Sequence, residues 1–98
     1  MNAFQELISS GKPVLVDFTA TWCGPCKMMA PVLEQVKRTL GEKITIIKID
    51  IDKSPQTASS FQIQGVPTLL LFKGGNLQWR QSGVMDAPQL TGILNRYL

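Results

Sequence analysis

The sequence predicts an α/β protein with a mixed central sheet of four strands, flanked by helices on both faces. Two apolar runs, residues 14–18 and 44–51, are separated by a long segment with helical spacing. A strand, helix and strand in this order require a right-handed parallel crossover, which places the second strand beside the first. Two later runs, residues 69–72 and 77–82, are joined by Gly74-Gly75-Asn76, which is typical of a hairpin between antiparallel strands.

Composition indicates a single domain covering residues 1–98. A chain of 98 residues with 44% hydrophobic residues can build one core but not two. The formal net charge is +3, and no run of like charges suggests a nucleic-acid-binding arm. No stretch is long enough to span a bilayer, and the N-terminus lacks the basic flank and apolar stretch of a signal peptide. We therefore expect a cytoplasmic protein with no nucleic-acid or membrane partner.

The first predicted helix covers residues 3–10. Asn2 and Gln5 form the pattern of a capping box, and Gly11 suits the position after the helix end. The run at residues 14–18 is continuously apolar apart from Asp17, as expected of a central strand covered on both faces.

The second helix should begin at Pro25 and continue to about Leu40. Apolar and charged residues then alternate in the second half of 44–51, which is typical of a strand near the sheet edge. Ser54-Pro55 predicts the start of a short helix that ends near Phe61. Asp86 caps a last helix whose predicted core-facing residues are Leu90, Ile93, Leu94 and Leu98.

Cys23 and Cys26 are the only cysteines, and Pro25 between them suits the first turn of a helix. Cys23 then lies at or near the N-cap, where free N–H groups, the helix dipole and Lys27 favour a thiolate. Cys26 lies one turn later on the same side and should be less exposed. The spacing predicts a nucleophilic thiol at Cys23 and a resolving thiol at Cys26.

Two other interpretations of the cysteines remain open at this point. A structural disulfide is disfavoured, because a two-residue gap closes too small a loop to stabilise the fold much. A zinc site needs about four ligands, whereas the chain offers two cysteines and no histidine. The C-x-x-C spacing near a strand–helix–strand pattern favours a redox pair.

Two charged residues fall on neighbouring predicted strands. Asp17 is an acid inside an apolar run, so it is either satisfied by neighbouring N–H groups or exchanges protons with a thiol. We favour proton exchange, because the strand leads directly into the loop with Cys23 and Cys26. Lys48 is either a solvated edge charge or a neighbour of Asp17.

Four segments resemble successive motifs of the thioredoxin family, in order and across nearly the whole chain: Val14-Leu15-Val16-Asp17-Phe18, Trp22-Cys23-Gly24-Pro25-Cys26-Lys27, Gly65-Val66-Pro67-Thr68 and Phe72-Lys73-Gly74-Gly75. The resemblance implies a thioredoxin fold that lacks the family's first strand, a buried acid at Asp17 and Lys48 beside it. Spacing alone would make Pro67 an ordinary strand-start proline, whereas the resemblance implies a cis proline facing the active-site sulfur. One departure is Thr19, where thioredoxins often carry an aromatic residue.

The resemblance also implies a surface that docks extended substrates, with backbone pairing at Val66. Its residues are Trp22, Gly24, Pro25, Val66, Pro67 and Gly83. The implied function is a protein-disulfide reductase that needs no metal or bound cofactor and is recycled by a thioredoxin reductase. A disulfide oxidase or isomerase is disfavoured by Gly24-Pro25, and a binding module with incidental redox activity has no unusual segment to support it. With the family's first strand absent, residues 44–51 become an exposed edge, so we expect a monomer that dimerises weakly through it.

Overall fold

The structure, a computed structural model, describes residues 3–98. In chain order it contains α1 (Ala3–Ile8), β1 (Val14–Thr19), α2 (Gly24–Leu40), η1 (Gly41–Lys43), β2 (Thr45–Asp50), α3 (Pro55–Ser60), β3 (Thr68–Lys73), β4 (Asn76–Ser82), α4 (Ala87–Leu94) and η2 (Asn95–Tyr97), where η marks a 3-10 turn. The predicted helices and strands are therefore present. The first helix ends at Ile8 instead of residue 10, and the predicted cap at Asn2 lies outside the described residues.

The four strands form one mixed sheet in the order β2-β1-β3-β4, as predicted. β1 pairs in parallel with β2 and antiparallel with β3, while β3 and β4 form an antiparallel hairpin. The β1–β2 register places Asp17 directly opposite Lys48. Within the described residues, β2 and β4 are the two edges of the sheet.

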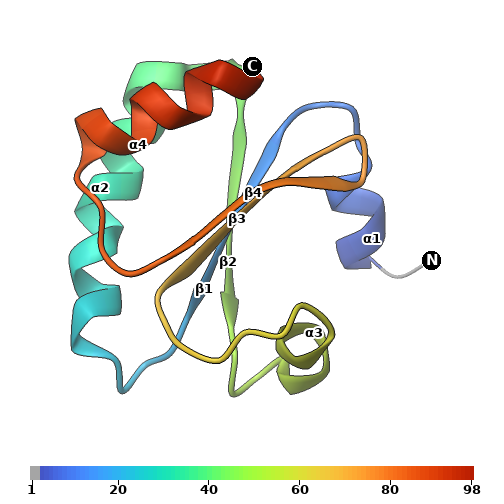
Figure 1. The fold of residues 1–98 in the computed structure, drawn as a ribbon, viewed down its shortest axis with the longest axis vertical. Helices are drawn as coiled ribbons and strands as arrows, with labels where there is room; N and C mark the ends of the chain where they lie inside the picture. Colours follow the sequence, from blue (N-terminus) through green and yellow to red (C-terminus); the bar gives the residue numbers. More distant parts are fainter. Residues whose placement is uncertain (1–2) are drawn as a thin grey trace.

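Helices cover both faces of the sheet, with α2 and α4 on one side and α1 and α3 on the other (Figure 1). Successive residues of a strand point to opposite faces. Leu15 of β1 belongs to the core cluster under α2 and α4, whereas Val14 and Val16 pack in the cluster under α1 and α3. Asp17 therefore points to the same face as Leu15, the face that α2 covers. No helix in residues 3–98 is long and apolar enough to cross a membrane.

The β3–β4 hairpin turns through two glycines. Gly74 and Gly75 have φ values of 60° and 83°, which L side chains rarely adopt. Asn76, predicted as part of the turn, instead begins β4. The register then shifts between Leu71 and Phe72, so Gln78 is an extra residue in β4 and the strand carries a β-bulge.

The C-terminal helix starts as predicted, because the Asp86 carboxylate accepts the Gln89 N–H at 2.8 Å. Leu90 and Leu94 of this helix are fully buried in the core, as predicted. The prediction that Leu98 faces the core was wrong, since it is 39% exposed. The α-helix ends at Leu94 and a 3-10 turn follows, which changes the helical period on which that prediction depended.

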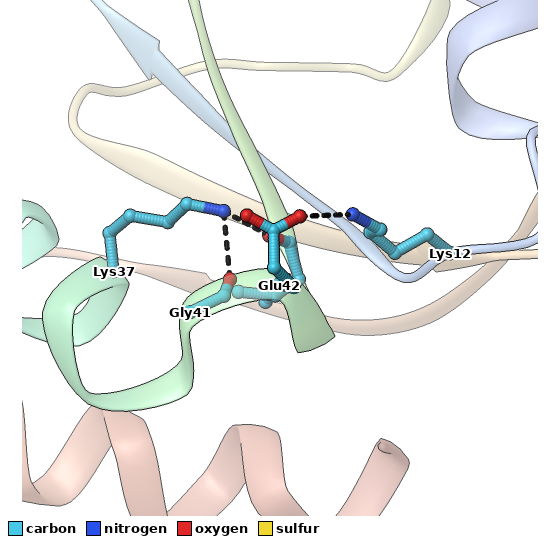
Figure 2. Close-up of polar contacts among 5 residues, drawn as sticks. Lys12, Lys37, Gly41 and Glu42 are labelled. Carbon is cyan, nitrogen blue, oxygen red and sulfur yellow. Dashed lines mark hydrogen bonds and ion pairs between the residues drawn. The ribbon is translucent and has the colours of Figure 1, made fainter.

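The connection from α2 to β2 is held by a lysine. Lys37 Nζ donates to the carbonyl oxygens of Gly41 at 2.8 Å and of Ile44 at 2.6 Å. Figure 2 shows this amine reaching the turn, with Lys12 and Glu42 paired at 3.5 Å alongside it. Lys37 thus caps free carbonyls at the helix end and fixes where β2 begins.

Candidate active site

The two cysteines lie at the start of α2. Cys23 is the N-cap in extended conformation, followed by Gly24 and then Pro25 in the first turn. The two sulfurs form a disulfide, and the Cys26 N–H also donates to Cys23 Sγ at 3.1 Å. After reduction, the same N–H and the positive end of the helix dipole would stabilise a Cys23 thiolate.

The expected difference in burial between the cysteines was wrong. Cys23 is 4% exposed and Cys26 is 6% exposed, so both are buried in the disulfide form. The reason is that both cysteines belong to one buried cluster with Ala20, against which Ile51 and Val66 pack. The position at the helix start, rather than exposure, therefore distinguishes the two thiols.

Three of the sequence-predicted residues meet beside Cys23. The Val66–Pro67 peptide bond is cis, as the resemblance implies. The carbonyl oxygen of Val66 lies 3.6 Å from Cys23 Sγ, and the Gly83 N–H donates to the Pro67 carbonyl at 2.9 Å. Segments that are more than forty residues from Cys23 in sequence thus form one wall of the site.

Trp22 forms the exposed side of the site, with 67% of its surface accessible. Its indole Nε1 donates to Asp52 Oδ2 at 2.7 Å. Asp50 in turn accepts the N–H groups of Asp52 at 2.8 Å and Lys53 at 3.3 Å through Oδ1, which forms an Asx turn after β2. Asp52 was missed as a site residue, because sequence spacing places it 30 residues from Trp22 and gives no sign of the contact.

Asp17, which was predicted to be a site residue, is a buried acid on β1. It is 1% exposed, and its Oδ1 atom has no hydrogen-bond partner among the described residues. The alternative in which neighbouring N–H groups satisfy this carboxylate is therefore wrong for Oδ1. Burial raises the pKa of Asp17 from 3.8 to about 6, and the positive charge of Lys48 acts in the opposite direction. Lys48 is thus a neighbour of Asp17 as well as an exposed edge residue.

A groove of about 570 Å³ adjoins the cysteine surroundings through Ile51. It lies between α3 and the segment that leads to Val66, and the residues lining it are Ile51, Pro55, Ala58, Ser59, Gln62, Ile63 and Gln64. The groove combines apolar residues with amide and hydroxyl groups and carries no charged side chain.

A closely spaced dithiol at a helix N-terminus, beside the Val66–Pro67 peptide, defines a dithiol/disulfide oxidoreductase. The family model Thioredoxin matches residues 1–96, and the chain belongs to this family. Its sequence is 56% identical over 91 residues to a thioredoxin of Alicyclobacillus acidocaldarius, covering 93% of this chain and 87% of that protein.

Two further comparisons agree with this assignment. Thioredoxin Y2, chloroplastic, of Arabidopsis thaliana is 50% identical over 90 residues, which cover 91% of this chain and 54% of that protein. The solved structure of a mutant thioredoxin from Halobacterium salinarum superposes with a TM-score of 0.87 at 35% identity, covering 96% of this chain and 81% of that one. Family membership and fold therefore agree.

Proposed function

We propose that the protein is a protein-disulfide reductase. The Cys23 thiolate attacks one sulfur of a substrate disulfide, forms a mixed disulfide and releases the other substrate sulfur as a thiolate, which takes up a proton. Cys26 then loses its proton and attacks Cys23 Sγ, so the second substrate sulfur leaves as a thiol. Two electrons pass to the substrate, and the Cys23–Cys26 disulfide remains.

One observation carries this proposal: the sulfur of Cys23 lies at the N-terminus of a 17-residue helix and accepts the Cys26 N–H at 3.1 Å. That environment lowers the free energy of a thiolate relative to a thiol. It favours Cys23 as the nucleophile that attacks the substrate disulfide. Cys26 is on the same side of the helix, one turn on, within reach of that bond.

We infer that Asp17 exchanges protons with Cys26 during resolution. Its carboxylate points to the sheet face that α2 covers, and α2 carries Cys26 in its first turn. A carboxyl group with a pKa of about 6 can hold or release a proton near neutral pH, whereas an ordinary aspartate is already ionised. Lys48 limits the rise in this pKa through its positive charge.

We infer further that substrates dock as extended segments beside Val66. The Val66 carbonyl next to Cys23 Sγ could accept a substrate N–H and align the substrate disulfide with the thiolate. The other residues that we propose to contact the substrate are Trp22, Gly24, Pro25, Pro67 and Gly83. The uncharged groove between α3 and Val66 would take the adjoining part of the substrate.

Each turnover leaves an oxidised dithiol, so a second protein must return two electrons to it. We propose a thioredoxin reductase in that role, which makes the chain an electron carrier in cellular redox homeostasis. The proposed location is the cytoplasm, where a reducing glutathione pool favours disulfide reduction. The working form is proposed to be a monomer at low concentration.

The proposal is tested with two matched substitutions. Cys23→Ser should reduce activity in an insulin-reduction assay to background and form no covalent complex with substrates. Cys26→Ser should also lose turnover but should accumulate mixed disulfides, detectable by mass spectrometry without reductant. Covalent complexes trapped by Cys23→Ser instead would reverse the roles, and a strongly oxidising potential for the pair would contradict a reductase.

A further inference from the structure

The segment of residues 61–67 joins α3 to β3 and contains no helix or strand (Figure 1). It begins with a turn at Gln62, whose φ of 54° lies in the left-handed region. The Ile63 N–H donates to the carbonyl of Ala58 at 3.0 Å. The Gln62 N–H donates to that of Ser59 at 3.0 Å, which completes the Schellman motif of a helix end. Glycine usually occupies this position, so with glutamine there, further contacts must hold the turn.

Arg80 of β4 supplies such contacts. It lies opposite Leu70, which belongs to the cluster under α1 and α3, so both side chains point to the face that α3 covers. The guanidinium donates through Nη1 to the carbonyl oxygen of Phe61 and through Nη2 to that of Gln62, the second at 2.8 Å. Free carbonyls at the end of a helix favour a cation. This pair of hydrogen bonds, the Arg80 clamp, fixes two successive peptide units of the turn.

The β3 end of the segment is held by a chain of hydroxyl groups. Thr68 Oγ1 donates to the carbonyl oxygen of Gly65 at 2.6 Å. Because a hydroxyl has one proton, Ser82 Oγ, which is 2.9 Å away, must donate to Thr68 Oγ1. Val66, the residue after Gly65, is thereby fixed from the β3 side, and the Arg80 clamp fixes the segment from the α3 side.

The turn is also the corner of the groove that adjoins the cysteine surroundings. One wall of the groove consists of α3 residues, and the other consists of Gln62, Ile63 and Gln64. The two walls meet at the turn that Arg80 holds. Arg80 itself lies outside the set of residues that line the groove, so its effect on an occupant passes through the turn.

We propose that Arg80 is a positioning residue for protein substrates. The inference rests on the proposed reductase function and names what holds its docking surface in shape. An extended substrate that contacts both Val66 and the groove must find them in a fixed arrangement, whereas a small disulfide reaches Cys23 without this surface. Loss of the Arg80 clamp should therefore weaken docking of protein disulfides and leave the reaction at Cys23 unchanged.

The test compares a protein disulfide with a small one. Arg80→Met keeps an apolar stem but removes both donors. We expect KM for insulin to rise about tenfold with kcat close to that of the parent, because only binding is lost. Reduction of hydroxyethyl disulfide, an uncharged small molecule, should keep the rate of the parent. Arg80→Lys retains the charge without the planar pair of donors and should give an intermediate KM.

Two further variants separate positioning from charge and stability. Arg38→Met makes the same charge change in the last turn of α2, on the other face of the sheet, and should match the parent with both disulfides. Gln62→Gly suits the left-handed turn, so the turn should hold without the Arg80 clamp. Added to Arg80→Met, it should return KM for insulin to that of Gln62→Gly alone. Amide exchange at Ile63 should accelerate in Arg80→Met and slow again in the double variant.

Four results would overturn the proposal. Equal loss of activity toward both disulfides would make Arg80 a general structural residue, and an unchanged KM for insulin would show that docking does not need the clamp. An equal rise in KM with Arg38→Met would make the effect one of net charge. A double variant that does not recover would place the effect in a direct contact of Arg80 with the substrate. If the parent reduces neither disulfide, the reductase function fails and this inference with it, a result that is distinct from any difference between the variants.

Discussion

The proposed site has an inner side, the buried strand β1 with Asp17, and an outer side, the surface with Trp22 and Asp52, and the two differ in burial and in hydrogen bonding. On the inner side, β1 carries Asp17, which is 1% exposed and has one oxygen without a partner among residues 3–98. On the outer side, Asp52 accepts a hydrogen bond from Trp22, whose ring is 67% exposed. Of the Asp17 and Asp52 carboxylates, only that of Asp52 accepts a hydrogen bond among the described residues.

This difference separates two tasks. A charged acid inside an apolar strand, with one oxygen lacking a hydrogen-bond partner among the described residues, lowers the stability of the folded state, so its presence is better explained by proton chemistry than by folding. A hydrogen-bonded acid at the surface can fix an aromatic ring without such a cost. We therefore expect changes on the inner side to alter pH dependence, and changes on the outer side to alter substrate docking.

The largest effect should follow Asp17→Asn. Because burial raises the folded-state pKa to about 6, the folded protein binds a proton more tightly than the unfolded chain does. Stability of the parent then falls as pH rises from 3.8 to about 6 and stays low above that. At about 1.4 kcal/mol per pKa unit, the variant should gain up to about 3 kcal/mol at pH 7.

Urea unfolding at two pH values provides the check on Asp17. The gain should be present at pH 7 and should almost disappear near pH 3.5, which lies below the pKa of Asp17 in both states. The variant should also reduce disulfides more slowly at neutral pH, because Asn cannot exchange a proton with Cys26. A variant less stable than the parent at pH 7 would show that the carboxylate has partners which the structure does not contain.

Much of the inner side could be predicted from local sequence patterns. The apolar run around Asp17 indicated a buried central strand, and Pro25 placed the cysteines at a helix start. Strand–helix–strand connectivity then gave the parallel pairing that puts Lys48 opposite Asp17. Each of these features depends on residues that are close in sequence or on the handedness of one crossover.

The outer side depends on contacts between distant segments, and sequence patterns do not encode those. Asp52 looked like one of several charges alternating along an edge strand, but an Asx turn at Asp50 directs it toward Trp22. The similar burial of the two cysteines follows from Val66 and Ile51 packing over them, which no local pattern reports. The cis bond before Pro67 came from family resemblance and not from spacing.

A second, smaller effect on stability should follow replacement of Gly83, and Gly24, also on the outer side, is its control. Gly83 has a φ of 95°, whereas Gly24 is the first residue of α2, and a Cβ added at either would meet no atom within 4 Å. Gly83→Ala should therefore cost about 1–2 kcal/mol of stability through backbone strain alone. Gly24→Ala should be neutral or slightly stabilising, because the helix suits alanine better. Denaturant midpoints compare the pair, and equal midpoints would mean that the Gly83 backbone relaxes freely.

The smallest effect should follow replacement of Asp52, the carboxylate on the outer side. Asp52→Ala removes the acceptor for the Trp22 indole, and losing one hydrogen bond of about 1 kcal/mol should raise KM for a protein disulfide about fivefold. Stability should change little, because both groups are at the surface.

Asp52→Asn is the matched control. It keeps an acceptor oxygen and should leave KM near that of the parent, which separates positioning of the ring from the effect of charge. An upfield shift of the Trp22 indole N–H resonance in Asp52→Ala alone would confirm that the ring has been released. If both variants raise KM equally, the negative charge of Asp52 contacts the substrate directly, and the outer side does more than hold an aromatic ring in place.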